Sequence, residues 1–126
     1  MKYKLKTIID SRGRLTVLEP IKRAFWLYDV QSARGGHSHD TMTETLVAVH
    51  GSFWVRLDDG RSREAIFMND PGEALEIKPN TWVSVDTFSD GAVCLCLADC
   101  EYSEEGYTRL YCDFVRESKK RDTRSN

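Results

Sequence analysis

Short β-prone segments separated by turn residues constrain the fold of this chain more than any other feature. About ten such segments follow one another, and none carries an apolar stripe of helical period over about ten residues. Asp58-Asp59-Gly60-Arg61 is a strong hairpin signal, since Asp-Gly pairs favour the positive φ angles of tight hairpin turns. The pattern predicts an all-β sandwich or barrel.

The expected strands are the stretches in which apolar, aromatic and β-branched residues cluster. They cover residues 3–9, 15–18, 22–30, 45–50, 53–57, 65–68, 75–77, 82–88 and 92–98, and residues 107–115 form a strand or a short helix. Residues 45–50 are almost all apolar, which predicts burial on both faces. We also expect Trp26, Trp54 and Trp82 to lie mostly in the core. We expect one domain over residues 1–126, with a charged, frayed tail from about residue 117.

Composition excludes several classes of function. The net charge of −2 gives no general attraction to nucleic acid or to an anionic membrane. No apolar run follows the first residues, as a signal peptide requires, and the longest run, residues 92–98, is too short to span a bilayer. The four cysteines match no zinc pattern of paired CxxC sequences. We therefore expect a cytoplasmic protein with free thiols and no nucleic-acid or membrane partner.

The stretch Arg34-Gly35-Gly36-His37-Ser38-His39 holds two of the three histidines. On an extended strand, His37 and His39 point to the same face. Two imidazoles on one inner face form either a metal site or a proton-transfer site; two surface histidines at a turn are the ordinary alternative. We expect the two glycines to form a bulge that directs the histidines inward, because no helix follows to complete a phosphate-binding loop.

The spacing Gly36-His37-x-His39-x4-Glu44-x6-Gly51 resembles the first motif of the cupin superfamily, and Gly72, Pro79 and Trp82 stand where the second motif would lie. More narrowly, the chain resembles the sugar-nucleotide 3,4-ketoisomerases, the WxcM-like or FdtA-like cupins with an RmlC-like jelly roll. The residues that carry this resemblance are Ile8-Ile9-Asp10-Ser11-Arg12-Gly13, Ile21-Lys22-Arg23, the histidine stretch, Gly51-Ser52, Leu57-Asp58-Asp59-Gly60, Pro79-x-x-Trp82 and Tyr102-x4-Tyr107-x-Arg109-x-Tyr111-x2-Phe114.

The resemblance implies a double-stranded β-helix, or jelly roll, in a homodimer that exchanges N-terminal strands. It also implies an isomerase that needs no metal or other cofactor. Its substrate would be a dTDP-linked 4-keto-6-deoxyhexose, converted to the 3-keto sugar on the way to a deoxyamino sugar for a surface polysaccharide or a glycosylated product. Two positions depart from the family pattern: Val83 stands where members often have histidine, and Glu44 where they tend to have glutamine.

The chemistry of a 3,4-ketoisomerase needs a group that takes a proton from the carbon beside a ketone and returns one to the neighbouring carbon. Histidine does this near neutral pH. His39 is our candidate base, and the resemblance points to the same position. His37 is the candidate for moving the hydroxyl proton or polarising the carbonyl. Tyr28 is a candidate hydrogen-bond partner, with ordinary core packing as its alternative.

A nucleotide-linked sugar also brings a pyrophosphate, which guanidinium groups bind well. Arg23 interrupts an apolar strand and Arg34 precedes the glycines, so both are candidate pyrophosphate ligands. Pairing of Arg23 with Asp29 or Glu44 is the alternative.

Glu44 is a further candidate substrate-binding residue, and it also leads to a rival interpretation, since it places a carboxylate near the two histidines. A metal-dependent cupin enzyme would use His37, His39 and Glu44 as ligands. A non-catalytic sugar-nucleotide-binding cupin is the second rival.

Overall fold

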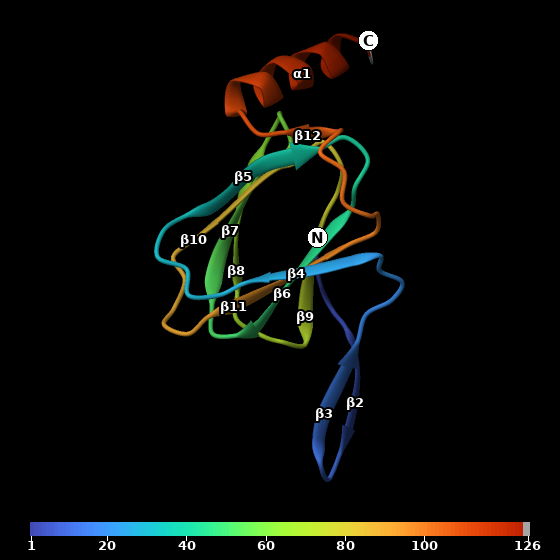
Figure 1. Cartoon of the computed structure of the whole chain (residues 1–126), viewed down its shortest axis with the longest axis vertical. Coiled ribbons are helices and arrows are strands. Elements are labelled where there is room, and N and C mark those ends of the chain that lie inside the picture. The colour runs from blue at the N-terminus through green and yellow to red at the C-terminus, as the bar shows by residue number, and fades with distance from the viewer. Residues whose placement is uncertain (125–126) are drawn as a thin grey trace.

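Turn residues divide the chain into many short strands, as the sequence predicts. The computed structural model describes residues 1–124, drawn in Figure 1. The elements, in chain order, are β1 (Lys2–Lys4), β2 (Lys6–Asp10), β3 (Gly13–Val17), β4 (Arg23–Leu27), β5 (Arg34–His39), β6 (Glu44–His50), β7 (Phe53–Asp58), β8 (Arg63–Met68), β9 (Glu73–Ile77), β10 (Trp82–Asp86), β11 (Val93–Ala98), β12 (Tyr107–Thr108) and α1 (Tyr111–Arg124).

Two five-stranded antiparallel sheets form the body of the protein. Their strand orders are β1-β9-β6-β11-β4 and β12-β5-β10-β7-β8, and both sheets contribute side chains to one core, which includes Leu46, Phe53, Val55 and Cys94. This architecture confirms the predicted all-β jelly roll of the cupin type.

Alternation along the strands gives the first sheet two distinct faces. On the inner face, Cys96 of β11 lies between Phe25 and Leu46 of its neighbours, whereas on the outer face Leu95 lies between Trp26 and Val47. The prediction that the tryptophans lie mostly in the core is wrong for Trp26, whose exposure is 58%. Burial of β6 on both faces holds only as far as Ala48, because Val49 and His50 are exposed.

A bulge interrupts β5 where the glycines were expected to form one. Val83 of β10 pairs with His37, and Ser84 pairs with Gly35, so Gly36 has no opposite partner. Gly36 has a φ angle of 73°, which favours glycine. The prediction of a bulge before the histidines is therefore confirmed.

The prediction of a frayed tail from about residue 117 is wrong as far as residue 124, because this segment is helical. Residues 125 and 126, which the prediction also covers, lie outside the described part of the chain. The charged segment belongs to α1, whose buried stripe includes Phe114 and Ser118. A Cβ atom at Gly60 would lie 2.7 Å from the Ser118 side chain, so the helix packs on the β7–β8 turn where that turn has no side chain. Arg61 also pairs with Asp122 at 2.7 Å.

The N-terminal hairpin projects from the body, at the end opposite α1 (Figure 1). The strand predicted over residues 3–9 is divided: β1 pairs with β9, and β2 pairs with β3. Ile8, Ile9 and Leu15 are exposed on the hairpin. Among residues 1–124, no helix has the length and apolar character needed to cross a membrane.

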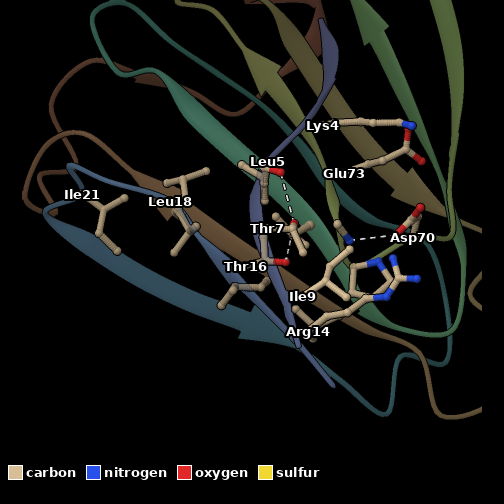
Figure 2. A pocket seen from close by; sticks show the side chains of 16 residues that line it. Lys4, Leu5, Thr7, Ile9, Arg14, Thr16, Leu18, Ile21, Asp70 and Glu73 are labelled. Carbon is tan, nitrogen blue, oxygen red and sulfur yellow. Dashed lines mark hydrogen bonds between the residues drawn. The ribbon is translucent and has the colours of Figure 1, made fainter. Parts of the chain in front are cut away.

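A groove of about 670 Å³ separates the hairpin from the outer face of the first sheet. Figure 2 shows Leu5, Leu18 and Ile21 on one side of it, with polar groups such as Arg14 and Asp70 farther along. Together, the hairpin and the outer face expose several apolar side chains, including Ile9, Leu15 and Trp26.

Candidate functional site

A cavity of about 240 Å³ lies between the two sheets, on the inner face of the first. Residues of β4, β5, β6, β10, β11 and β12 line it, together with nearby loop residues. Its ionisable and phenolic lining residues include Arg23, Arg34, His37, Glu44, Tyr107 and Arg109. The structure therefore brings together four of the six predicted site residues.

His37 and Glu44 form a pair on the cavity wall. The Nε2 atom of His37 lies 3.5 Å from Oε2 of Glu44, and the two side chains are 18% and 6% exposed. A carboxylate at this distance stabilises the positive charge that the imidazole gains when it takes a proton. This pair is the part of the cavity best suited to proton abstraction.

His39 has different surroundings, although it lies on the same strand. Its Nδ1 atom accepts hydrogen bonds from the backbone amides of Thr41, at 3.1 Å, and Met42, at 2.9 Å. Asp40 Oδ1 lies farther from the same nitrogen, at 3.5 Å, and its side chain is mostly exposed, so the amides determine the tautomer. A ring that accepts at Nδ1 carries its proton on Nε2.

His39 is 8% exposed and is not among the residues that line the cavity. Gly106 lies directly against its ring: a Cβ atom there would be 3.0 Å from Nε2. The imidazole is therefore held on both sides, by the amides at Nδ1 and by Gly106 near Nε2.

Tyr107, which is not among the site residues predicted from the sequence, contacts both histidines. Its ring centroid lies 5.6 Å from that of His37 and 4.7 Å from that of His39, and both contacts are edge-on. Strand pairing places Tyr107 opposite His39. The only signal for it in the sequence was its place in the tail of the family pattern.

Arg23 donates a hydrogen bond from Nη2 to the Tyr107 hydroxyl at 2.9 Å. Its Nη1 atom is buried and has no hydrogen-bond partner. Within residues 1–124 no ion pair joins Arg23 to a carboxylate, so the predicted alternative with Asp29 or Glu44 does not occur there. A buried guanidinium nitrogen without an acceptor is suited to an anionic oxygen.

Two further arginines line the cavity. Arg34 is exposed, whereas Arg109 lies over the Tyr107 ring, with its guanidinium carbon 4.4 Å from the centroid. Arg109 donates two hydrogen bonds to Glu104, at 2.6 and 2.9 Å. These bonds, followed by one from the Tyr102 hydroxyl, lower the pKa of Glu104 to about 2.

Tyr28 lies away from the cavity, whereas two of the cysteines line it. Tyr28 is 62% exposed and is not among the residues that line the cavity. The cysteines are free thiols, as predicted. Cys94 and Cys96 form part of the cavity wall with their sulfur atoms 3.8 Å apart; their mutual hydrogen bond and burial raise the pKa of the Cys96 thiol.

The ligand set of the metal rival does not converge. Within the described residues 1–124, no three histidine, cysteine, aspartate or glutamate side chains form a group that could hold a metal ion. Val83, the other departure from the family pattern, is buried beside Val85 and makes this wall of the cavity apolar.

Comparison with known proteins identifies the family. The family model FdtA, described as WxcM-like, C-terminal, matches residues 2–119. The chain belongs to the FdtA family. This FdtA-family chain is also 36% identical over 120 residues to the TDP-4-oxo-6-deoxy-alpha-D-glucose-3,4-oxoisomerase of Aneurinibacillus thermoaerophilus, covering 88% of this chain and 86% of the relative.

Solved structures agree with the fold of this FdtA-family protein. QdtA, a sugar 3,4-ketoisomerase from Thermoanaerobacterium thermosaccharolyticum solved in complex with TDP, has a TM-score of 0.90 at 35% identity, covering 96% of this chain and 95% of that one. A single-residue mutant of QdtA in complex with TDP-4-keto-6-deoxyglucose has a TM-score of 0.90 at 34% identity, with coverage of 96% and 94%. The resemblance found in the sequence is therefore confirmed.

Proposed function

We propose that this protein is a 3,4-ketoisomerase that converts a dTDP-linked 4-keto-6-deoxyhexose to the 3-keto sugar. The observation that carries the proposal is the cavity, in which the His37–Glu44 pair faces the guanidinium groups of a nucleotide-sugar site. Family membership supports it, because the relatives act on or bind TDP-linked sugars.

The contacts of the two histidines favour an exchange of the roles that the sequence suggested. His37 lines the cavity beside a carboxylate, so we assign it the removal of the proton from C3. For His39 to take a proton at Nδ1, both backbone hydrogen bonds to that atom would have to break. Its buried ring, which meets Tyr107 edge-on, suits it instead to hold that phenol beside the cavity.

The arginines of the cavity are suited to bind the pyrophosphate and the hexose of the substrate. We assign the pyrophosphate to Arg34 and Arg109, since both are exposed lining residues with planar guanidinium groups. Arg23, the other pyrophosphate ligand suggested by the sequence, contacts the phenol between the two histidines, so we place it against the hexose. The apolar wall of Val83 and Val85 faces the same volume.

A homodimer is also part of the proposal. The hairpin exposes Ile8, Ile9 and Leu15, and the outer face of the first sheet exposes Trp26. A second copy of the chain that seats its hairpin on this outer face would cover both surfaces. Action in the cytoplasm, on the route to a deoxyamino sugar of a surface polysaccharide, remains a prediction.

The decisive experiment is incubation with dTDP-4-keto-6-deoxyglucose in deuterated water, followed by NMR. We expect signals of the 3-keto sugar and solvent deuterium on the reacting carbons. Binding of dTDP without any turnover would favour the non-catalytic sugar-nucleotide-binding module. Turnover that chelators abolish and added metal restores would favour the metal-dependent cupin enzyme.

A further inference from the structure

The hydroxyl group of Tyr107 is a hydrogen-bond donor without a good acceptor. Its oxygen accepts the bond from Arg23 at 2.9 Å, whereas its own proton faces the thioether sulfur of Met42 at 3.8 Å. Thioether sulfur is a weak acceptor. The Nη1 atom of Arg23 is also a donor without an acceptor, since it is buried and has no hydrogen-bond partner. Beside one cavity, a donor from β12 thus has only a weak acceptor, and a donor from β4 has none.

These donors lie where negative charge would develop in the proposed reaction. Tyr107 touches the rings of both histidines, so a sugar whose C3 is within reach of His37 also lies beside the phenol. Removal of the C3 proton moves the carbonyl electrons onto the C4 oxygen. Donors that are oriented before the reaction stabilise such an oxyanion most effectively, because they need not reorganise.

We propose that Tyr107 is a catalytic residue that donates its proton to the C4 oxygen, and that Arg23 is the positioning residue that holds the phenol. His37 takes the C3 proton, the C–H electron pair forms the C3=C4 double bond, and the carbonyl π pair takes the Tyr107 proton. The O3 proton then returns to the Tyr107 oxygen as the C3 carbonyl forms, and C4 receives a proton from His37. The step is a net isomerisation and needs no oxidant or reductant.

The inference rests on the proposed function, and Tyr107→Phe tests it because the variant keeps the ring and loses only the hydroxyl. We expect turnover number to fall by roughly 10²–10³, the usual loss when one oxyanion donor is removed, with KM and dTDP affinity little changed. The matched control is Tyr111→Phe. Tyr111 also accepts a bond from an arginine, Arg63, at 2.9 Å, but it lies outside the cavity, and we expect its variant to retain turnover.

Arg23→Lys separates the positioning role from pyrophosphate binding. Because dTDP has the pyrophosphate but no hexose, we expect the variant to bind dTDP as the wild type does and to turn over more slowly. Weaker dTDP binding would instead assign Arg23 to the pyrophosphate and overturn its part of the inference. Wild-type turnover in Tyr107→Phe would overturn the proposal that Tyr107 donates a proton to the C4 oxygen. A wild-type protein that does not isomerise the sugar would reject the proposed function itself, so the two failures are distinguishable.

Discussion

The two faces of the sheet that contains β4, β11 and β6 differ in a way that separates the cavity from the surface of the proposed dimer. Its inner face presents Arg23 and Glu44 to the cavity, whereas its outer face presents Trp26 and Leu95 to the groove or to solvent. Arg23 and Trp26 are three positions apart on the same strand. Because side chains alternate, neighbouring residues can be changed to perturb one face without the other.

The largest effect should come from the cavity, at His37, which lies on β5 of the other sheet. We expect His37→Asn to lower turnover by roughly 10²–10⁴, the usual contribution of a general base, with dTDP affinity and dimer formation nearly intact. Exchange of the C3 proton with deuterated solvent, followed by NMR, measures the abstraction step directly.

His39→Asn is the matched variant on the same strand. We expect a smaller fall in turnover, with exchange at C3 retained, because its Nδ1 atom is occupied by backbone amides. Loss of exchange in His39→Asn alone would return the role of base to His39.

The next effect concerns the outer face. Trp26→Ala should weaken the proposed dimer by about 2 kcal/mol, or about 30-fold in Kd, since Trp26 would anchor its interface, and turnover at high protein concentration should be retained. Sedimentation at several protein concentrations measures this. Phe67→Ala removes an exposed aromatic side chain from the other sheet and serves as the control. Dissociation in the control but not in Trp26→Ala would place the interface elsewhere.

Glu44→Gln should have a smaller effect on the inner face. A neutral amide stabilises imidazolium less than a carboxylate does, so we expect some loss of turnover. Because glutamine is the residue that the family resemblance leads us to expect at this position, we expect turnover to stay within about tenfold of the wild type. Activity assays with and without a chelator provide the measurement. An inactive variant that has also lost bound metal would support the metal rival.

The smallest effect is a pH dependence at Glu104. Arg109 first, and then Tyr102, lower the pKa of this carboxyl from 4.5 to about 2 in the folded protein. A lowered folded-state pKa gives stability that is present above the ordinary value and lost as pH falls towards the folded one. Glu104 is exposed, so the contribution is small. Thermal unfolding between about pH 2 and 4.5 should therefore depend less on pH in Glu104→Gln; identical curves would remove this role.

Local sequence signals predicted most strands, because turn residues and the period of two are local properties. For residues 107–115 they left a strand or a short helix open, and they did not predict that α1 continues to residue 124, since its buried stripe includes Ser118, which packs where Gly60 has no side chain. Trp26 was misplaced for a related reason: a strand pattern shows alternation but not which face a neighbouring strand will cover.

The site was predicted as far as its residues are close in sequence. The histidine stretch and Glu44 lie within one short segment, and the structure keeps His37 and Glu44 together. Tyr107 reaches the histidines only through the pairing of β12 with β5, which no local pattern specifies. Likewise, the hydrogen bonds from Thr41 and Met42 to Nδ1 of His39, which set it apart from His37, appear only in the folded chain.

The unpaired Gly36 changes which side chains of β5 face the cavity. Arg34 and His37 are separated by an odd number of positions, which on a regular strand would place them on opposite faces, yet both line the cavity. The extra residue shifts the phase of the alternation between them, since Arg34 pairs with Val85 and His37 with Val83. One strand can thus direct both a guanidinium and an imidazole into the same cavity, and an insertion or deletion at this point would turn one of them out to solvent.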